Sequence, residues 1–135
     1  MVKDGLLWLE TCSSTNDEAA TRINEPGLVA VASHHQEQGR GRMGRSWFSP
    51  PGCGLYMSWI ARPKFPQSMG GAIPMLAAAA TAEVMTELGI KPTLKWPNDV
   101  LIGRQKLSGI LCEAQGTSAS WSAIVGIGLN LRTPP

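Results

Sequence analysis

The densest group of cationic side chains in the sequence lies on its most glycine-rich segment. In QGRGRMGRSW, residues 38–47, arginines alternate with glycines and a tryptophan follows: Arg40, Arg42, Arg45 and Trp47. Glycine lets backbone N–H groups approach a ligand, and arginine offers a planar set of donors that suits phosphate or carboxylate. No acidic residue occurs in residues 38–82. The segment predicts an anion-binding loop, while a solvated basic loop or a nucleic-acid segment would have the same composition.

A second polar group surrounds Pro97 in KWPNDVLI, residues 95–102, where a lysine, an amide and a carboxylate lie within five residues: Lys95, Asn98 and Asp99. Proline fixes φ and holds such a turn. A lysine on a rigid corner can neutralise phosphate oxygens, and Asp99 can hold a magnesium ion. An Asx-turn at Asn98 and Asp99, with Trp96 in the core, would explain the turn without any function.

Two further segments combine glycine with strand-forming residues. In KLSGILCEA, Lys106 heads a strand and Gly109 lies inside it, which indicates a bulge or a closely approaching ligand. In GIGLN, residues 126–130, glycines at alternate positions either leave one strand face open to a ligand or accommodate a side chain from a helix.

Small polar residues precede the arginine loop. Ser14 and Thr15 of SSTN, together with Gln36, offer the donors and acceptors that a polar heterocycle needs, although helix capping alone would account for the first two. His34 and His35 are interpreted as strand-end surface or core residues rather than as catalysts.

The elements that position these groups follow from hydrophobic pattern and turn residues. A strand over 6–10 precedes a short helix over 13–23, which opens with a T-x-x-E capping box at Thr15 and Glu18. The alanine-rich segment 68–88 predicts a long helix that ends at Gly89, with Pro74 either in its first turn or at its true start. The expected strands are 6–10, 28–35, 54–61, 93–96, 100–102, 106–114 and 121–131, the last four in an antiparallel meander. The predicted class is α+β, with a mixed, mostly antiparallel sheet packed against helices.

Length and composition limit the function classes. The chain has 135 residues, 43% hydrophobic and 16% charged, with a net charge of +2, which fits one soluble domain and not a general nucleic-acid or membrane binder. Its three cysteines lie far apart without zinc-ligand spacing, so Cys53 and Cys112 are interpreted as packing residues in a reduced, cytoplasmic compartment. We expect no signal peptide and no membrane span.

Taken together in this order, SSTN, QEQGRGRMGRSWFSP, KWPNDVLI, KLSGIL and GIGLN resemble the catalytic domain of the biotin protein ligases. The resemblance runs from Ser13 to Asn130, and G-R-G-R-x-G-R-x-W followed by K-W-P-N-D is a specific pair, as is the eleven-residue step from Lys95 to Lys106. It implies the class II synthetase-like fold of the biotin and lipoate ligases. It also implies an enzyme that joins biotin to ATP with Mg²⁺, releases pyrophosphate, and passes biotin from biotinyl-5′-AMP to a lysine of the biotin carboxyl carrier protein of acetyl-CoA carboxylase.

The resemblance assigns roles to individual residues of this chain. The catalytic group would be Lys106, Arg40, Arg42, Lys95 and Asp99, with Asp99 also a candidate magnesium ligand. Biotin would contact Ser14, Thr15, Asn16, Gln36, Gly39, Arg40, Gly41, Arg42, Lys106 and Gly109. The nucleotide would contact Arg40, Arg42, Trp47, Lys95, Asn98, Asp99, Lys106 and Asn130. No residue would act as a covalent nucleophile.

Two departures from the family pattern leave alternatives open. Met43 stands where some relatives carry another arginine, which would affect loop packing or retention of the adenylate. The domain, 1–135, stops soon after GIGLN, where bacterial members continue into helices and an SH3-like domain, and no N-terminal helix-turn-helix domain is expected. A lipoate–protein ligase and a binding remnant without transfer activity therefore remain alternatives. No nucleic-acid or membrane partner is expected, and a homodimer through a sheet edge is left open.

Overall fold

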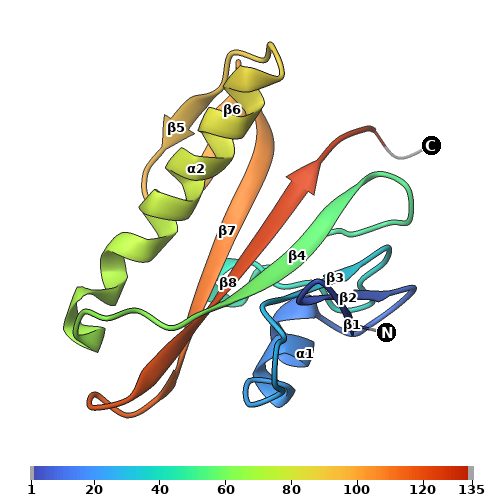
Figure 1. Ribbon diagram of the computed structural model, residues 1–135. Coiled ribbons are helices and arrows are strands. Elements are labelled where there is room, and N and C mark those ends of the chain that lie inside the picture. The colour runs from blue at the N-terminus through green and yellow to red at the C-terminus, as the bar shows by residue number, and fades with distance from the viewer. Residues whose placement is uncertain (1, 134–135) are drawn as a thin grey trace.

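One mixed β-sheet runs through the protein, seen in a computed structural model that describes residues 2–133 (Figure 1). Within these residues the sheet has eight strands in the order β1-β2-β3-β4-β8-β7-β6-β5. Neighbouring strands are antiparallel except for β2 and β3, which α1 connects as a parallel pair. The predicted class and the predicted meander of the last four strands are confirmed.

The bounds of most elements lie close to those predicted from the pattern. The strands are Val2–Lys3 (β1), Leu6–Leu9 (β2), Ala30–Ser33 (β3), Gly54–Ala61 (β4), Thr93–Lys95 (β5), Asp99–Ile102 (β6), Gln105–Gly116 (β7) and Trp121–Asn130 (β8). The helices are Thr15–Thr21 (α1) and Ile73–Glu87 (α2), with 3-10 turns at Arg42–Gly44 (η1) and Gln67–Ala72 (η2). Strand β3 is shorter than the predicted 28–35, and the two-residue strand β1 was not predicted.

The predicted capping box at the start of α1 is wrong. The helix begins at Thr15 after Ser14, and among the described residues the Ser14 side chain makes no capping hydrogen bond. The hydroxyl of Thr15 instead donates to Gln36, and Glu18 accepts from Arg22. The side-chain atoms that a capping box would use are therefore bonded to Gln36 and to Arg22.

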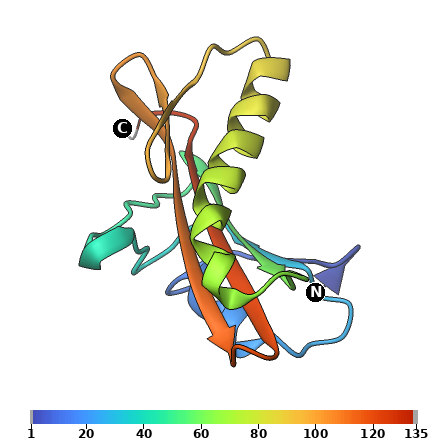
Figure 2. The ribbon, with the colours of Figure 1, turned by 90° about the vertical axis from the view of Figure 1, so that its left-hand side faces the viewer.

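The two helices cover opposite faces of the sheet. Consecutive strand residues point to opposite faces, and on β8 Ile124 packs with Ala19 of α1 while Val125 packs with Ala78 of α2. Figure 2 shows α2 lying along the sheet on one side, with α1 behind it. Side chains that face α1 therefore share one side of the sheet, and this side carries the predicted site.

Helix α2 forms where alanine-rich sequence predicts it, with Pro74 in its first turn and Gly89 at φ +84° after its end. Together with η2 it makes an apolar segment, Gln67–Glu87, of 21 residues and hydropathy 1.2. By length and composition alone this segment is long and apolar enough to cross a membrane, which is weak evidence and does not test the expectation from the sequence. Within the described residues 11% of the window is buried, with Ala78 and Met85 packed against the sheet.

Candidate functional site

The arginine loop, Gly39–Trp47, folds as a small hairpin rather than as an irregular segment. Arg40 and Ser46 pair across it, and the Trp47 N–H donates to the Gly39 carbonyl at 2.8 Å. Its tip is the turn Arg42–Gly44, where Met43 and Gly44 both have positive φ, at 59° and 74°. The Met43 side chain is 86% exposed. Methionine at this position therefore makes little packing contact in this conformation.

The indole of Trp47 covers a pair of glycines in the sheet. Gly109 on β7 and Gly128 on β8 are register partners. A Cβ atom on Gly109 would lie 2.8 Å from the ring, and one on Gly128 would overlap it. A Cβ atom on Gly126 would overlap the side-chain oxygen of Asn16 from α1. The alternate glycines of GIGLN thus admit one side chain from a helix and one from the arginine loop.

Buried hydroxyl and amide groups form the floor of the site. Oε1 of Gln36 accepts hydrogen bonds from the backbone N–H of Thr15, at 2.8 Å, and from its hydroxyl, at 3.0 Å. Nε2 of Gln36 donates to the Ser49 hydroxyl at 2.8 Å. The Ser58 hydroxyl, fully buried on β4, contacts Thr15 Oγ1 at 2.8 Å and donates to Oδ1 of Asn16. Because these groups are satisfied within the protein, they hold fixed positions beside the cavity.

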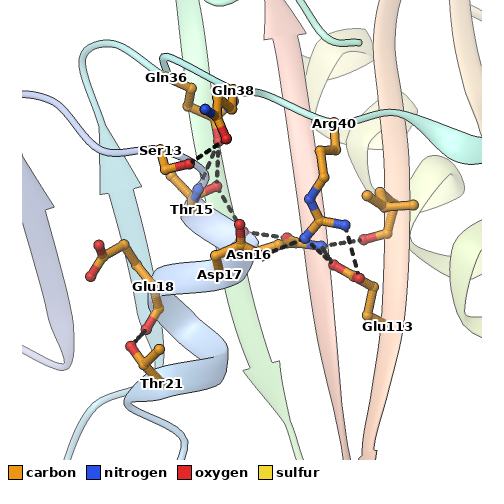
Figure 3. A network of polar contacts seen from close by, with 12 residues as sticks. Ser13, Thr15, Asn16, Asp17, Glu18, Thr21, Gln36, Gln38, Arg40 and Glu113 are labelled. Atoms are coloured by element: carbon orange, nitrogen blue, oxygen red, sulfur yellow. Dashed lines mark hydrogen bonds and ion pairs between the residues drawn. The ribbon is translucent and has the colours of Figure 1, made fainter. Parts of the chain in front are cut away.

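Asn16 and Arg40 are joined through one carboxylate on β7 (Figure 3). Nδ2 of Asn16 donates to Glu113 Oε1 at 2.7 Å. The Arg40 guanidinium donates to both oxygens of Glu113, at 3.0 and 2.9 Å, and to Oδ1 of Asp17 at 2.6 Å. The hydrogen bond from Arg40 lowers the pKa of Glu113, and the bond to Glu113 raises the pKa of Arg40.

Two carboxylates hold the Arg40 guanidinium in this conformation, and Arg40 is among the residues that line the cavity, beside Gly41 and Arg42. The predicted role of Arg40 toward a ligand carboxylate or phosphate stays a prediction, because its guanidinium contacts these carboxylates here. Arg42 and Arg45 are exposed on the loop.

Lys106 lies between Asp99 and Trp47. Its Nζ is 3.0 Å from Asp99 Oδ1 and 5.2 Å from the centroid of the Trp47 ring. The pair with Asp99 has the distance of an ion pair, although Oδ1 accepts no hydrogen bond from the described residues. The register brings Lys95, Asp99, Gly109 and Gly128 into one row across β5 to β8, so all four face the α1 side.

The strand β7 has its irregularity next to Lys106. Val100 pairs with Ser108 and Leu101 pairs with Lys106, so Leu107 is the extra residue of a bulge. The sequence located a bulge or a close approach at Gly109. Both are present within two residues, with the bulge at Leu107 and the close approach of Trp47 at Gly109 itself.

Two asparagines anchor the backbone around the site. Asn98 is buried, and its side-chain Nδ2 donates to the Ile110 backbone carbonyl at 2.8 Å. The backbone carbonyl of Asn98 accepts from the Ile110 N–H at 3.0 Å. Asn130 donates from Nδ2 to the Lys106 carbonyl at 3.1 Å. Trp96 is 75% exposed, so the alternative that placed it in the core is wrong.

Two cavities meet at Trp47 and Lys106. The smaller, about 50 Å³, is lined by Ser14, Thr15, Asn16, Gln36, Arg40, Gly41, Arg42, Trp47, Asn98, Lys106, Gly109, Ile110, Leu111, Gly126, Ile127 and Gly128. The larger, about 530 Å³, is lined by Trp47, Lys106 and Asn130 among others.

Most predicted site residues are thus brought together. Gly39, Lys95 and Asp99 line neither cavity: Gly39 is buried against the Trp47 carbonyl, Lys95 is exposed on β5, and Asp99 contacts the site through Lys106.

Asp99 is the residue that the sequence predicts as a magnesium ligand. Its Oδ1 is buried and accepts no hydrogen bond in the part of the chain that the structure describes. Within residues 2–133, no group of three His, Cys, Asp or Glu side chains could hold a metal ion. Mg²⁺ in nucleotide sites is often bound by one or two carboxylates together with phosphates and water, and the single carboxylate suits such an arrangement.

Burial makes two of the three cysteine thiols harder to ionise. Cys12, Cys53 and Cys112 are all free thiols. Burial raises the pKa of Cys112 to about 11 and also raises the pKa of Cys12. A thiol with a raised pKa is a poor nucleophile at neutral pH, in agreement with the interpretation of Cys112 as a packing residue.

The family model of the biotin/lipoate A/B protein ligases matches residues 8–130. The chain belongs to this family. It is 39% identical to the bifunctional ligase/repressor BirA of Bacillus subtilis over 96% of its own length and 41% of that protein. It is 36% identical to the biotin–[acetyl-CoA-carboxylase] ligase of Paracoccus denitrificans, over 94% of the chain and 55% of that protein.

A solved member of the family has the same fold. The biotin protein ligase from Aquifex aeolicus in complex with biotin and ATP is matched with a TM-score of 0.81 at 34% identity, over 98% of this chain and 56% of that one. The chain therefore spans about two fifths to just over half of the length of these relatives.

Three side chains at the site of the present chain were not identified from its sequence: Asp17, Ser58 and Glu113. Glu113 follows Gly109 and Leu111 at alternate positions of β7, so the period of a strand would have placed it on the same face. Ser58 has no comparable signal, because its position opposite Asn16 depends on how α1 lies against β4.

Proposed function

We propose that this chain is the adenylating part of a biotin–protein ligase. It would activate biotin with ATP to biotinyl-5′-AMP, release pyrophosphate, and transfer biotin to a lysine of the biotin carboxyl carrier protein of acetyl-CoA carboxylase. The observation that carries the proposal is the meeting of two cavities at Lys106 and Trp47, one with a floor of amide and hydroxyl groups and one open and larger.

The floor of the smaller cavity favours biotin over lipoate. Thr15, Asn16 and Gln36 offer hydrogen-bond donors and acceptors that match the ureido group of biotin. The dithiolane ring of lipoate has no N–H donor and no carbonyl, so it would form no hydrogen bond with this floor. Each hydrogen bond that biotin forms there and lipoate cannot form is worth about 0.5–1.5 kcal/mol. The polar floor thus provides specificity between two cofactors whose ligases share a family.

The junction of the cavities is where the two substrates would react. A carboxylate oxygen of biotin must attack the α-phosphorus of ATP, and both groups are anionic. Lys106 lies at this junction with its Nζ on Asp99, and a cation here offsets the repulsion between substrates. Lys106 would exchange Asp99 for the biotin carboxylate and the phosphate oxygen. When bound, Mg²⁺ would neutralise phosphate charge, with Asp99 as its protein ligand.

Admission of biotin requires the arginine loop to move. Cavities that bind small molecules usually have volumes of about 300–1,000 Å³, whereas the smaller cavity here has about 50 Å³. Trp47 and Arg40 of the loop both line it. Opening of the loop would admit biotin, and closure would place Trp47 over the adenylate and exclude water from its hydrolysable anhydride.

The second half-reaction would use a nucleophile from the partner. The lysine amine of the carrier protein would attack the carbonyl carbon of biotinyl-5′-AMP, form an amide and release AMP. A cytoplasmic location fits three free cysteines. The chain spans 41% and 55% of two relatives, and docking of the carrier and dimerisation are not assigned to particular residues of this chain.

Exchange of labelled pyrophosphate into ATP tests the proposal. We expect exchange that requires biotin and Mg²⁺, with lipoate as the parallel substrate giving none. Exchange with lipoate alone would replace the proposal by a lipoate ligase. If biotinyl-5′-AMP raises the melting temperature but no exchange occurs, the chain binds the intermediate without forming it.

A further inference from the structure

Glu113 connects three segments that are far apart in the sequence. From β7 it contacts Asn16 at the start of α1 and Arg40 of the arginine loop, 97 and 73 residues away. Figure 3 shows the carboxylate joined by dashed lines to both side chains. It does not line either cavity, so its action on a ligand would pass through the residues it holds.

Glu113 fixes the orientation of the Asn16 amide. Oδ1 of Asn16 accepts from Ser58, and Nδ2 donates to the Leu111 carbonyl at 3.3 Å and to Glu113 at 2.7 Å. A flipped amide would turn its oxygen toward two acceptors. Removing the carboxylate leaves the long bond to Leu111 as the restraint on Nδ2.

The same carboxylate holds the arginine loop. Arg40 has a fork of two N–H groups on the two oxygens of Glu113, which is the strongest geometry for this ion pair. Asp17 adds a third contact at 2.6 Å. One positive and two negative charges meet here, so the base of the loop carries no net positive charge while it is closed.

We propose that Glu113 is a positioning residue of the site, which keeps the arginine loop closed through Arg40 and the Asn16 amide in its binding orientation. This inference rests on the proposed function for the identity of the ligand, biotin. Without Glu113 the loop opens more often, and biotin dissociates faster. Side chains of Arg40 and Glu113 are 39% and 36% exposed, so an effect of about two- to five-fold is expected.

Two measurements on Glu113→Gln test the proposal. Trypsin cleavage after Arg42 and Arg45 under native conditions reports loop opening, and rapid-mixing displacement of biotin reports its dissociation rate. We expect both rates to rise about two- to five-fold, since glutamine keeps the shape and the bond to Asn16 but loses the charge. Equal rates for the variant and the parent would overturn the proposal.

The matched control is Glu18→Gln. Glu18 and Arg22 form an ion pair of similar exposure, 32% and 38%, at 3.3 Å, and this pair involves neither Glu113 nor Arg40. This variant loses the same charge and a comparable ion pair, so a general loss of stability would accelerate cleavage in both. We expect acceleration in Glu113→Gln alone, and equal acceleration in both would also overturn the proposal.

Two further variants are Arg40→Met and the double variant Arg40→Met/Glu113→Gln. Trypsin should cleave both at the same rate, because without Arg40 the Glu113 carboxylate has no partner on the loop. If the parent does not bind biotin, the proposed function fails, while the trypsin rates still decide whether Glu113 closes the loop.

Discussion

The ammonium group of Lys106 lies 3.0 Å from Oδ1 of Asp99. The Asp99 side chain is 17% exposed and the Lys106 side chain 42% exposed, so the carboxylate is largely buried while the lysine remains accessible. An anionic substrate that reaches Lys106 through the larger cavity would compete with Asp99 for the same ammonium. The structure thus keeps a cation at the junction of the cavities without leaving it unpaired.

Lys106→Ala is expected to reduce biotin-dependent pyrophosphate exchange by about 10- to 150-fold, because a hydrogen bond to a charged group contributes about 1.5–3 kcal/mol. The fold should persist, since the side chain is 42% exposed. Exchange kinetics and the melting temperature measure the two effects. Lys91→Ala, at an exposed position after α2, is the control. A Lys106→Ala protein that exchanges at the parent rate would refute the role of this lysine.

The sequence predicts most elements because their signals are local. Alternating strand residues, the alanine-rich segment before Gly89 and the glycines of GIGLN need no tertiary information. The contacts of Glu113 and Trp47 could not be predicted in this way, because they depend on the register of β7 with β8 and on the docking of α1. The capping box fails for the same reason, since Thr15 uses its hydroxyl on Gln36.

Gly128→Ala is expected to displace Trp47 and weaken biotin binding by about five- to 150-fold. A Cβ atom here overlaps the indole ring, and forcing an extra carbon into a packed contact costs about 1–3 kcal/mol. Binding calorimetry measures the effect. Gly71→Ala is the matched control, because its Cβ atom meets no described atom within 4 Å. If both variants bind biotin as the parent does, Trp47 does not cover the glycine pair in the binding state.

The Cys112 thiol is expected to resist alkylation in the folded protein. Burial raises its pKa from 9.0 to about 11, so the thiolate population at pH 8 falls about 100-fold. Iodoacetamide labelling at pH 8, followed by peptide mass spectrometry, should show Cys112 reacting about 100-fold more slowly in the native protein than in urea. Labelling at the unfolded rate would show that the thiol is accessible and ionised.

The ion pair of Glu113 predicts a pH dependence of stability. The hydrogen bond from Arg40 lowers the pKa of Glu113 below its ordinary value of 4.5, so the folded state binds the proton more weakly than the unfolded state does. The stability that this gives is complete above about pH 4.5 and is lost as the pH falls through the lowered value. Because both side chains are more than a third exposed, the contribution is about 0.2–1 kcal/mol.

Urea unfolding of the parent and of Glu113→Gln from pH 7 to pH 3 measures this contribution. The other carboxylates titrate in both proteins, so their effects cancel in the difference between the two free energies of unfolding. We expect the parent to be more stable at pH 7 and the difference to shrink below pH 4.5, because a protonated Glu113 resembles glutamine. A difference that stays constant down to pH 3 would show that the charge of Glu113 contributes nothing to the fold, and that its hold on Arg40 is too weak to close the loop.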